Sequence, residues 1–392
     1  MTLDVLRPLA AEPLAGILAF QVVVLCIVLS NAAVLLRPPR DRRLSVPPLV
    51  SILVPARNEA RNVCTCVRSL LAQRYPRLEL LVLDDRSEDE TRALLEAEQG
   101  HDPRLVILAG AEPPPGWTGK NWACHQLSLA ARGDVLLFAD ADTEFFDRDA
   151  VGAIVGAMEA SRADLLSGLP RQVLGTLGET LLVPLFYWSF LSFTPLAAGL
   201  VWRRPAFTRA VGQLMTFRAE AYHAVDGHAA IRESVVDDLA LARRVARAGL
   251  ACRILDATGI VRCRMYRSGR EAYVGFRKNL FAAFGYAIVP FVFVWGWLAY
   301  THLAPIALLA LRPALPAGAR VEPALLAASV ALALIHWLFV YTRLKLPVWP
   351  ALLYPLTIVA FLAVAVGSFS STLRRRGSWK GRALDPRPTR WI

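Results

Sequence analysis

The distribution of apolar and charged positions divides the chain into membrane-length and globular stretches. Residues 14–36 hold no charged side chain, and a helix of that length can cross a hydrocarbon core of about 30 Å. Residues 45–280 have dispersed charges and short apolar runs, which are typical of a soluble α/β domain. Three further spanning stretches follow it: Phe281 to Leu311, Pro323 to Tyr341 and Val348 to Thr372. The predicted parts are an anchor (1–44), a globular domain (45–280), a C-terminal transmembrane region (281–372) and a basic cytosolic tail (373–392).

Strand-length apolar runs alternate with helical patterns in the globular stretch. Four such runs are Leu49 to Val54, Leu78 to Leu83, Leu105 to Leu108 and Val135 to Ala139. Between the first two, Val63, Val67 and Leu70 fall on one face of a helix predicted over 59–73. This alternation predicts a mostly parallel sheet, which binds ligands at the carboxyl ends of its strands.

Acidic residues stand at two of those strand ends. Asp84 and Asp85 follow the second run, and Asp140 and Asp142 follow the fourth. Side chains two apart on a strand point the same way, so Asp140 and Asp142 can share a divalent cation that neutralises a diphosphate. The earlier pair can accept hydrogen bonds from a uracil imide and a ribose hydroxyl. Acids after strands also serve as turn and cap residues, which is the structural alternative for each pair.

Three motifs, taken in order, carry a family resemblance. They are Val54-Pro55-Ala56-Arg57-Asn58-Glu59, Leu83-Asp84-Asp85-Arg86-Ser87 and Ala139-Asp140-Ala141-Asp142. Together they resemble the family 2 glycosyltransferases. The resemblance implies an α/β fold of the GT-A type, a nucleotide-diphosphate sugar donor, leaning towards UDP, and Mg²⁺ or Mn²⁺ at Asp140 and Asp142. The donor-binding residues that it implies are Pro55, Arg57, Glu59, Asp84, Asp85 and Asp140.

A third acidic pair, Asp237 and Asp238, opens a predicted helix. In the family this position usually reads Glu-Asp and the second acid is the catalytic base, so the resemblance makes Asp238 the base and Asp237 its support. A hydroxyl acceptor must lose a proton as it attacks the anomeric carbon, whereas a carboxylate acceptor needs no base. The alternative is two acids favoured by the helix macrodipole. Gly212 and Gln213 match a family element beside the acceptor or donor.

Cationic residues give a narrower resemblance. Lys120 and Lys278 can hold a departing diphosphate, although basic residues near a membrane also contact lipid headgroups. The segments 116–123, 264–266, 275–279 and 379–382 resemble the bacterial carotenoid (diaponeurosporenoate) and hopanoid-associated glycosyltransferases, and more distantly the ceramide glucosyltransferases. This implies a lipid acceptor such as a carotenoid or hopanoid.

Two other functions remain open. A processive polysaccharide synthase would carry Q-x-x-R-W ahead of its membrane helices, where this chain has residues 275–279; a similar string at 387–391 is interpreted as coincidental. A catalytically silent scaffold or nucleotide-sugar sensor is the alternative outside enzymes. Transfer of a single sugar is the favoured interpretation.

The uncharged, aromatic-rich run 181–202 also has membrane length. If it crossed a bilayer, Asp140 and Asp238 would lie on opposite sides and could not share a site. We therefore predict an interfacial or re-entrant element that presents the acceptor, with Trp188 on the acceptor side. A buried pair of hydrophobic helices is the alternative.

Charge placement predicts a multi-pass protein of the inner membrane. The net charge is +12, but Arg37, Arg40, Arg42 and Arg43 directly follow the first apolar run, which orients the domain towards the cytosol. Membrane lipid is therefore a better partner than nucleic acid. A cleaved signal peptide is the alternative for the first run. Three C-terminal crossings would leave the basic tail outside, unless a segment with Pro290 and Pro305, or with Pro350 and Pro355, is re-entrant.

Overall fold

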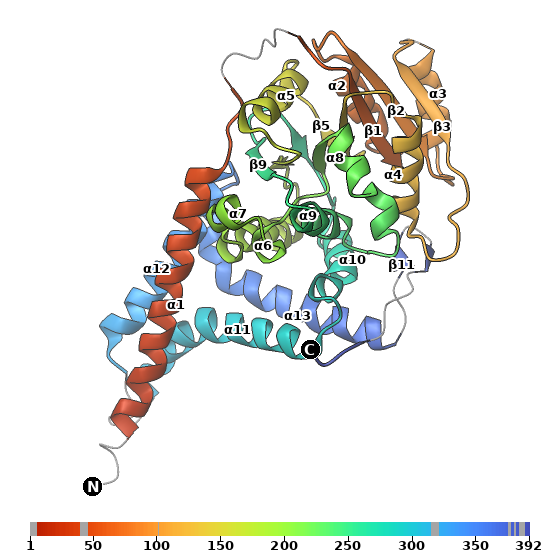
Figure 1. The fold of residues 1–392 in the computed structure, drawn as a ribbon. Coiled ribbons are helices and arrows are strands. Elements are labelled where there is room, and N and C mark those ends of the chain that lie inside the picture. Colours follow the sequence, from red (N-terminus) through yellow and green to blue (C-terminus); the bar gives the residue numbers. More distant parts are fainter. Residues whose placement is uncertain are drawn as a thin grey trace.

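The computed structural model describes residues 6–39, 46–100, 102–314, 321–374, 378–379, 382–383 and 389–392. Its globular domain is built on a seven-stranded sheet of order β3-β2-β1-β4-β8-β6-β9 (Figure 1). The strands are β1 (Val50–Ala56), β2 (Leu78–Asp84), β3 (Leu105–Ala109), β4 (Val135–Ala139), β6 (Leu165–Leu169), β8 (Leu214–Arg218) and β9 (Cys252–Asp256). All neighbours are parallel except β8, which is antiparallel to β4 and to β6. The predicted mostly parallel sheet is confirmed.

Helices cover both faces of this sheet. They are α2 (Val63–Leu71), α3 (Thr91–Gln99), α4 (Gly119–Ala130), α5 (Ala150–Ser161), α8 (Ala219–Ala224) and α9 (Asp237–Arg247). Helix α10 (Gly269–Leu280) packs instead among the apolar helices. Successive side chains of β1 point to opposite faces of the sheet. Ile52 and Val54 therefore pack with α2 and α5 on one face, whereas Leu53 packs with α4 and α9 on the other. A small second sheet joins β5 (Thr143–Glu144), β10 (Arg262–Cys263) and β7 (Arg171–Gln172).

Four helices in the described parts of the chain are long and apolar enough to cross a membrane. They are α1 (Leu6–Val34), α11 (Ile288–Leu311), α12 (Pro323–Arg343) and α13 (Tyr354–Leu373). The predicted stretch from Val348 begins instead with a 3-10 turn, η6 (Trp349–Leu353), which contains Pro350. The basic positions at 40, 42 and 43, and those at 375, 376 and 380, lie outside the described residues. The strand pair β11 (Ser378–Trp379) and β12 (Arg382–Ala383) falls within the predicted tail.

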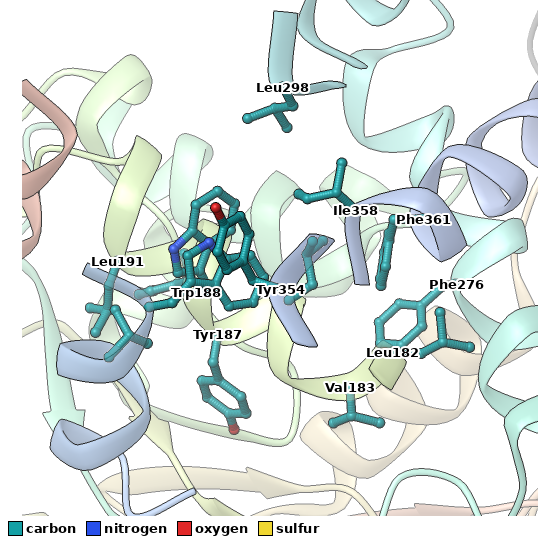
Figure 2. Packing of buried hydrophobic residues seen from close by; sticks show 14 of the residues in the cluster. Leu182, Val183, Tyr187, Trp188, Leu191, Phe276, Leu298, Tyr354, Ile358 and Phe361 are labelled. Carbon is teal, nitrogen blue, oxygen red and sulfur yellow. The ribbon is translucent and has the colours of Figure 1, made fainter. Parts of the chain in front are cut away.

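The run predicted to return to its starting side is two helices, α6 (Leu177–Phe193) and α7 (Leu196–Trp202), bent by 46°. Helix α6 is buried in an apolar cluster that draws on α1, α10, α12 and α13. Figure 2 shows Leu182, Trp188 and Leu191 of α6 packed together with Tyr354, Ile358 and Phe361 of α13. This cluster fixes the globular domain onto the apolar helices.

Asn31 on α1 satisfies the backbone at the break between α6 and α7. Its buried Nδ2 donates to the carbonyls of Leu191 (2.7 Å) and Thr194 (2.6 Å), and its Oδ1 accepts from the Leu196 amide (2.8 Å). A broken helix leaves such groups unpaired, and an apolar environment offers them no water. The side chain of Asn31 thus replaces the missing helical hydrogen bonds.

Asn31→Leu should therefore destabilise the protein by about 2–5 kcal/mol, because three buried backbone groups lose their partners at similar side-chain volume. The measurement is the thermal unfolding midpoint in detergent, which we expect to fall by several degrees. Ser30→Ala is the matched control, since Ser30 bonds only to the Ile27 carbonyl one turn back. An unchanged midpoint in Asn31→Leu would contradict this role.

Candidate active site

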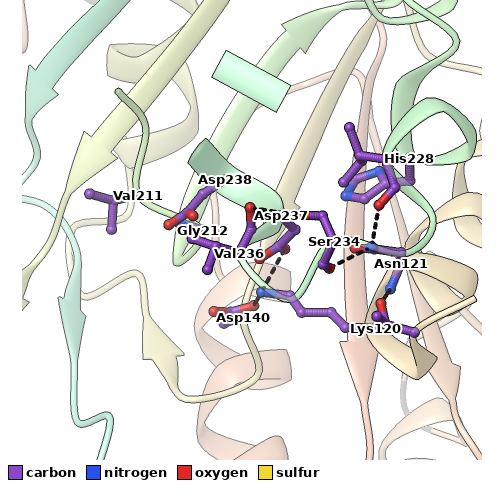
Figure 3. A network of polar contacts seen from close by, with 12 residues as sticks. Lys120, Asn121, Asp140, Val211, Gly212, His228, Ser234, Val236, Asp237 and Asp238 are labelled. Carbon is purple, nitrogen blue, oxygen red and sulfur yellow. Dashed lines mark hydrogen bonds and ion pairs between the residues drawn. The ribbon is translucent and has the colours of Figure 1, made fainter. Parts of the chain in front are cut away.

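One lysine joins two acidic pairs that are far apart in the sequence. Lys120 lies in the first turn of α4, and its Nζ is 2.8 Å from Oδ1 of Asp140 and 3.2 Å from Oδ2 of Asp237 (Figure 3). Asp140 follows β4, whereas Asp237 begins α9. Lys120 therefore links the carboxyl end of the central strand to the helix that carries Asp237 and Asp238.

The start of α4 is held in place by side chains around Lys120. Thr118 caps the helix by accepting from the Asn121 amide. The buried Asn121 Nδ2 donates to the carbonyls of Ile231 (2.9 Å), Arg232 (3.1 Å) and Ser234 (3.0 Å), on the segment that leads into α9 (Figure 3). Asn121 is a positioning residue that the sequence interpretation missed, since a single buried amide gives no pattern.

Asp238 lies beside Gly212. Its Oδ2 accepts from the Gly212 amide at 3.0 Å and its Oδ1 accepts from the Leu239 amide at 2.7 Å. Burial, followed by repulsion from Asp237, raises the pKa of Asp238 to about 6. A Cβ added at Gly212 would lie 3.4 Å from the Lys120 Nζ and 3.6 Å from Asp238, so this glycine lies between the cation and the candidate base. A carboxylate with this pKa is suited to accept a proton near neutral pH.

Asp142 has the properties of a cation ligand. Its Oδ1 is buried and has no hydrogen-bond partner among the described residues. Burial and the neighbouring charge of Asp140 raise the pKa of Asp142 to about 7, so Asp142 resists ionisation unless a further positive charge lies beside it. Among the described residues no group of three or more His, Cys, Asp and Glu side chains is placed to hold a metal. Two carboxylates with the remaining ligands from phosphate and water are nevertheless how Mg²⁺ is commonly bound, so the pair fits such an ion.

The acids, Lys120 and Gly212 line one cavity of about 2040 Å³. The predicted site residues in its lining are Pro55, Arg57, Glu59, Asp85, Lys120, Asp140, Asp142, Gly212, Gln213, Asp237, Asp238 and Lys278. The lining continues over apolar side chains of α6 and α10, including Phe186, Phe190 and Phe276. The cavity therefore reaches from the strand ends to the apolar helices.

Two residues that were predicted to belong to the site, Asp84 and Trp188, lie outside the cavity lining. Oδ1 of Asp84 accepts from the Ser87 amide at 3.1 Å, which is the turn role that was the alternative for this acid. Trp188 is fully buried, stacks on Trp337 with ring centroids 4.4 Å apart and donates from Nε1 to His336. Neither side chain is part of the cavity lining.

Some residues in the lining were given no role by the sequence interpretation. Arg209 lies three residues before Gly212, and Arg243 lies on α9 beyond Asp238. Arg390 also lines the cavity, although the string at 387–391 was interpreted as coincidental. Basic residues are frequent in this sequence, so only their spatial convergence distinguishes these three.

Comparison with known proteins agrees with this geometry. Residues 51–237 match the family model for glycosyl transferase family 2. Within these residues the chain has the sequence pattern of a family 2 glycosyltransferase domain. The match covers β1 to the first residue of α9. It includes Asp140 and Asp142 and ends at Asp237, directly before the candidate base.

Curated relatives of the family 2 domain are named 4,4'-diaponeurosporenoate glycosyltransferase. The protein from Staphylococcus haemolyticus is 26% identical over 236 residues, which cover 59% of this chain and 60% of the relative. That from Staphylococcus aureus is 25% identical with the same coverage. The chain thus matches about three fifths of the length of these relatives.

The fold extends beyond the family 2 domain in one solved structure. A mannosyltransferase from Pyrobaculum calidifontis superposes with a TM-score of 0.58 at 22% identity, covering 93% of this chain and 98% of its own. This likeness confirms the predicted GT-A fold.

Proposed function

We propose that this protein transfers one sugar, with inversion, from a nucleotide-diphosphate sugar to a membrane lipid of the carotenoid or hopanoid kind. The observation that carries the proposal is the single cavity that joins Asp140, Lys120 and Asp238 and continues over apolar side chains of α6 and α10. A water-soluble donor and a lipid acceptor need such a mixed site. The names of the staphylococcal relatives support a carotenoid acceptor.

The donor half of the proposed site consists of the strand-end residues. The Arg57 guanidinium donates to the carbonyls of Asp85 (2.7 Å) and Arg86 (2.9 Å), which fixes the loop after β2 beside the cavity. Asp140 and Asp142 would hold Mg²⁺ or Mn²⁺, which supplies positive charge for the leaving diphosphate. The Pyrobaculum mannosyltransferase, which has this fold, is in complex with GDP-Man and Mn²⁺. Lys120 adds a fixed cation at the same end of the cavity.

The acceptor half of the proposed site is centred on Asp238. An acceptor hydroxyl that enters from the apolar end would lose its proton to this carboxylate as its oxygen attacks the anomeric carbon, and the nucleoside diphosphate would leave from the opposite face. The backbone amide of Gly212 orients the carboxylate. Asp237, paired with Lys120, keeps this cation close to both halves of the site.

We further propose that α1, α11 and α12 cross the membrane and that α13 does not. Leu14 and Ile17 of α1 cluster with Leu326 at the start of α12, and Leu308 near the end of α11 packs against them, which defines a far end away from the domain. Helix α13 contributes nothing to that cluster. The Ser368 Oγ, near the end of α13, instead accepts from the Phe281 amide beside α10. Figure 1 shows α13 running below the domain alongside α11.

This topology predicts that residue 392 is cytosolic, which removes the conflict with the positive-inside rule. Green fluorescent protein fused after residue 392 should fluoresce, and alkaline phosphatase at the same position should be inactive. Alkaline phosphatase inserted between α11 and α12 should be active and serves as the control. Active phosphatase at residue 392 would require α13 to cross.

The test of the proposed function is a panel of UDP- and GDP-sugars offered to purified protein in lipid extract, with and without Mg²⁺ or Mn²⁺. Metal-dependent transfer of one sugar to an extractable lipid is the expected result. Long glycan products would indicate a processive synthase. Donor binding without transfer to any lipid would support a silent sensor.

A further inference from the structure

The segment 389–392, here called the strap, pairs with the first turn of α11. The Arg390 amide donates to the Tyr286 carbonyl at 3.0 Å. In return, the carbonyls of Arg390 and Trp391 accept from the amides of Ile288 (2.9 Å) and Val289 (3.0 Å). Figure 1 shows the C-terminal end of the chain at the start of α11, below α10.

The unpaired amides at the start of α11 explain the position of the strap. The first amides of a helix have no partner within it, and the residue before α11, Ala287, offers no side-chain cap. An apolar helix that begins at a membrane surface cannot leave such groups unpaired without cost. The strap carbonyls cap two of these amides, so the backbone position of Arg390 is determined by α11.

The side chain of Arg390 is thereby directed to the cavity. Arg390 lines the cavity together with Lys278 and Asn279 from the last turn of α10. Gly285, at a φ of +61°, leaves room beside it: a Cβ there would lie 3.0 Å from an Arg390 Nη2. No ion pair of the Arg390 guanidinium is found within the described part of the chain, and its side chain is exposed. An open cation therefore faces the cavity at the start of α11.

The surroundings of Arg390 differ from those of the donor end. Lys120, Asp140 and Asp142 form the polar end, whereas Leu280, Ala283 and Phe284, which line the cavity, belong to the segment that leads to Gly285, the glycine beside Arg390. A guanidinium presents a planar fork of donors that matches a carboxylate or a phosphate. An apolar wall beside a cation suits an amphiphile with an anionic group.

We propose that Arg390, held by the strap, binds an anionic oxygen of the lipid acceptor, either a carboxylate or a phosphate, at the membrane end of the cavity. The inference rests on the proposed function, because it requires the acceptor to be a lipid. It assigns Arg390 a role in binding the acceptor. The segment reaches the site from beyond the last long helix, through its pairing with α11.

The test compares Arg390→Gln with wild type in detergent by isothermal titration with three C18 probes: oleate, oleyl phosphate and oleyl alcohol. Gln keeps the backbone hydrogen bonds of the strap but removes the charge. We expect an anionic probe to bind Arg390→Gln about tenfold more weakly, as for loss of a charge-assisted hydrogen bond. Oleyl alcohol should bind both proteins equally. Which anion loses affinity distinguishes a carboxylate from a phosphate.

The steady-state kinetics of Arg390→Gln and a control variant form the second part of the test. The KM for the lipid acceptor should rise by a similar factor in Arg390→Gln, with kcat and the affinity for the nucleotide sugar unchanged. Arg92→Gln, which removes an exposed arginine of α3 in the same way, should match wild type. Equal binding of all three probes by wild type, or weaker donor binding by Arg390→Gln, would overturn the proposal. The probe experiment does not need turnover, so absence of sugar transfer would count against the proposed function alone.

Discussion

Asp238→Asn should lower kcat by about 10²–10⁴ with little change in the KM for the donor, because an amide cannot take the proton of an acceptor hydroxyl. The amide oxygen can still accept from the Gly212 backbone, so the fold around the site should persist. The measurement is initial rates of sugar transfer to lipid under saturating metal. Asp226→Asn is a suitable control, since Asp226 is exposed and pairs only with Arg244.

The pH dependence should separate loss of a base from a general loss of activity. Because the pKa of Asp238 is raised to about 6, the ionised, active form increases as the pH rises through that value. The kcat of wild type should therefore rise through about pH 6 and then level off, and this rise should be absent from the residual activity of Asp238→Asn. A variant that keeps full turnover would indicate an acceptor that needs no base, such as a carboxylate.

Lys120→Gln should lower kcat by about 10² or more, because it removes a fixed cation from the end of the cavity where the diphosphate would leave. Lys120 contacts both Asp140 and Asp237, so the variant also leaves two carboxylates facing each other without a cation. We expect the loss to exceed any change in acceptor KM. Single-turnover rates with the donor prebound would isolate the chemical step.

The control for Lys120→Gln is Arg92→Gln, which removes an exposed ion pair with Glu96 one turn along α3. A surface pair of this kind contributes about 0–1 kcal/mol, so its rate should match wild type. If Lys120→Gln were equally active, the cation would serve only to hold α4 against α9. Comparing thermal midpoints of the two variants would then measure that structural role.

Strands of the globular domain could be predicted from the local pattern of apolar residues. The predicted strands at 78–83, 105–108 and 135–139 agree with β2, β3 and β4 within one residue, because a buried strand must be apolar along its length. Asp140 and Asp142 could be assigned to a strand end for the same reason. That residues 181–202 do not cross a bilayer stays a prediction, which rests on a global constraint: the chain on both sides of this run must reach one site.

Contacts between residues that are far apart in the sequence could not be predicted from the sequence. Nothing local to Lys120 indicates that it contacts both Asp140 and Asp237, because that depends on how α4 and α9 pack on one face of the sheet. Trp188 was expected at the acceptor, but stacking on Trp337 and a bond to His336 place it inside the bundle. An aromatic residue in an apolar run has the same pattern in either position.

The sequence by itself determined the alternating α/β domain, its acidic strand ends and the apolar helices around it, because these depend on periodicity and composition over a few turns. Only the tertiary structure decided which charged side chains share a cavity. It also brought Arg390 to the start of α11, through backbone hydrogen bonds that any residue except proline can make at that position. Hydrogen bonds between distant backbone segments do not require particular side chains. The sequence therefore does not reveal them, and only the folded structure does.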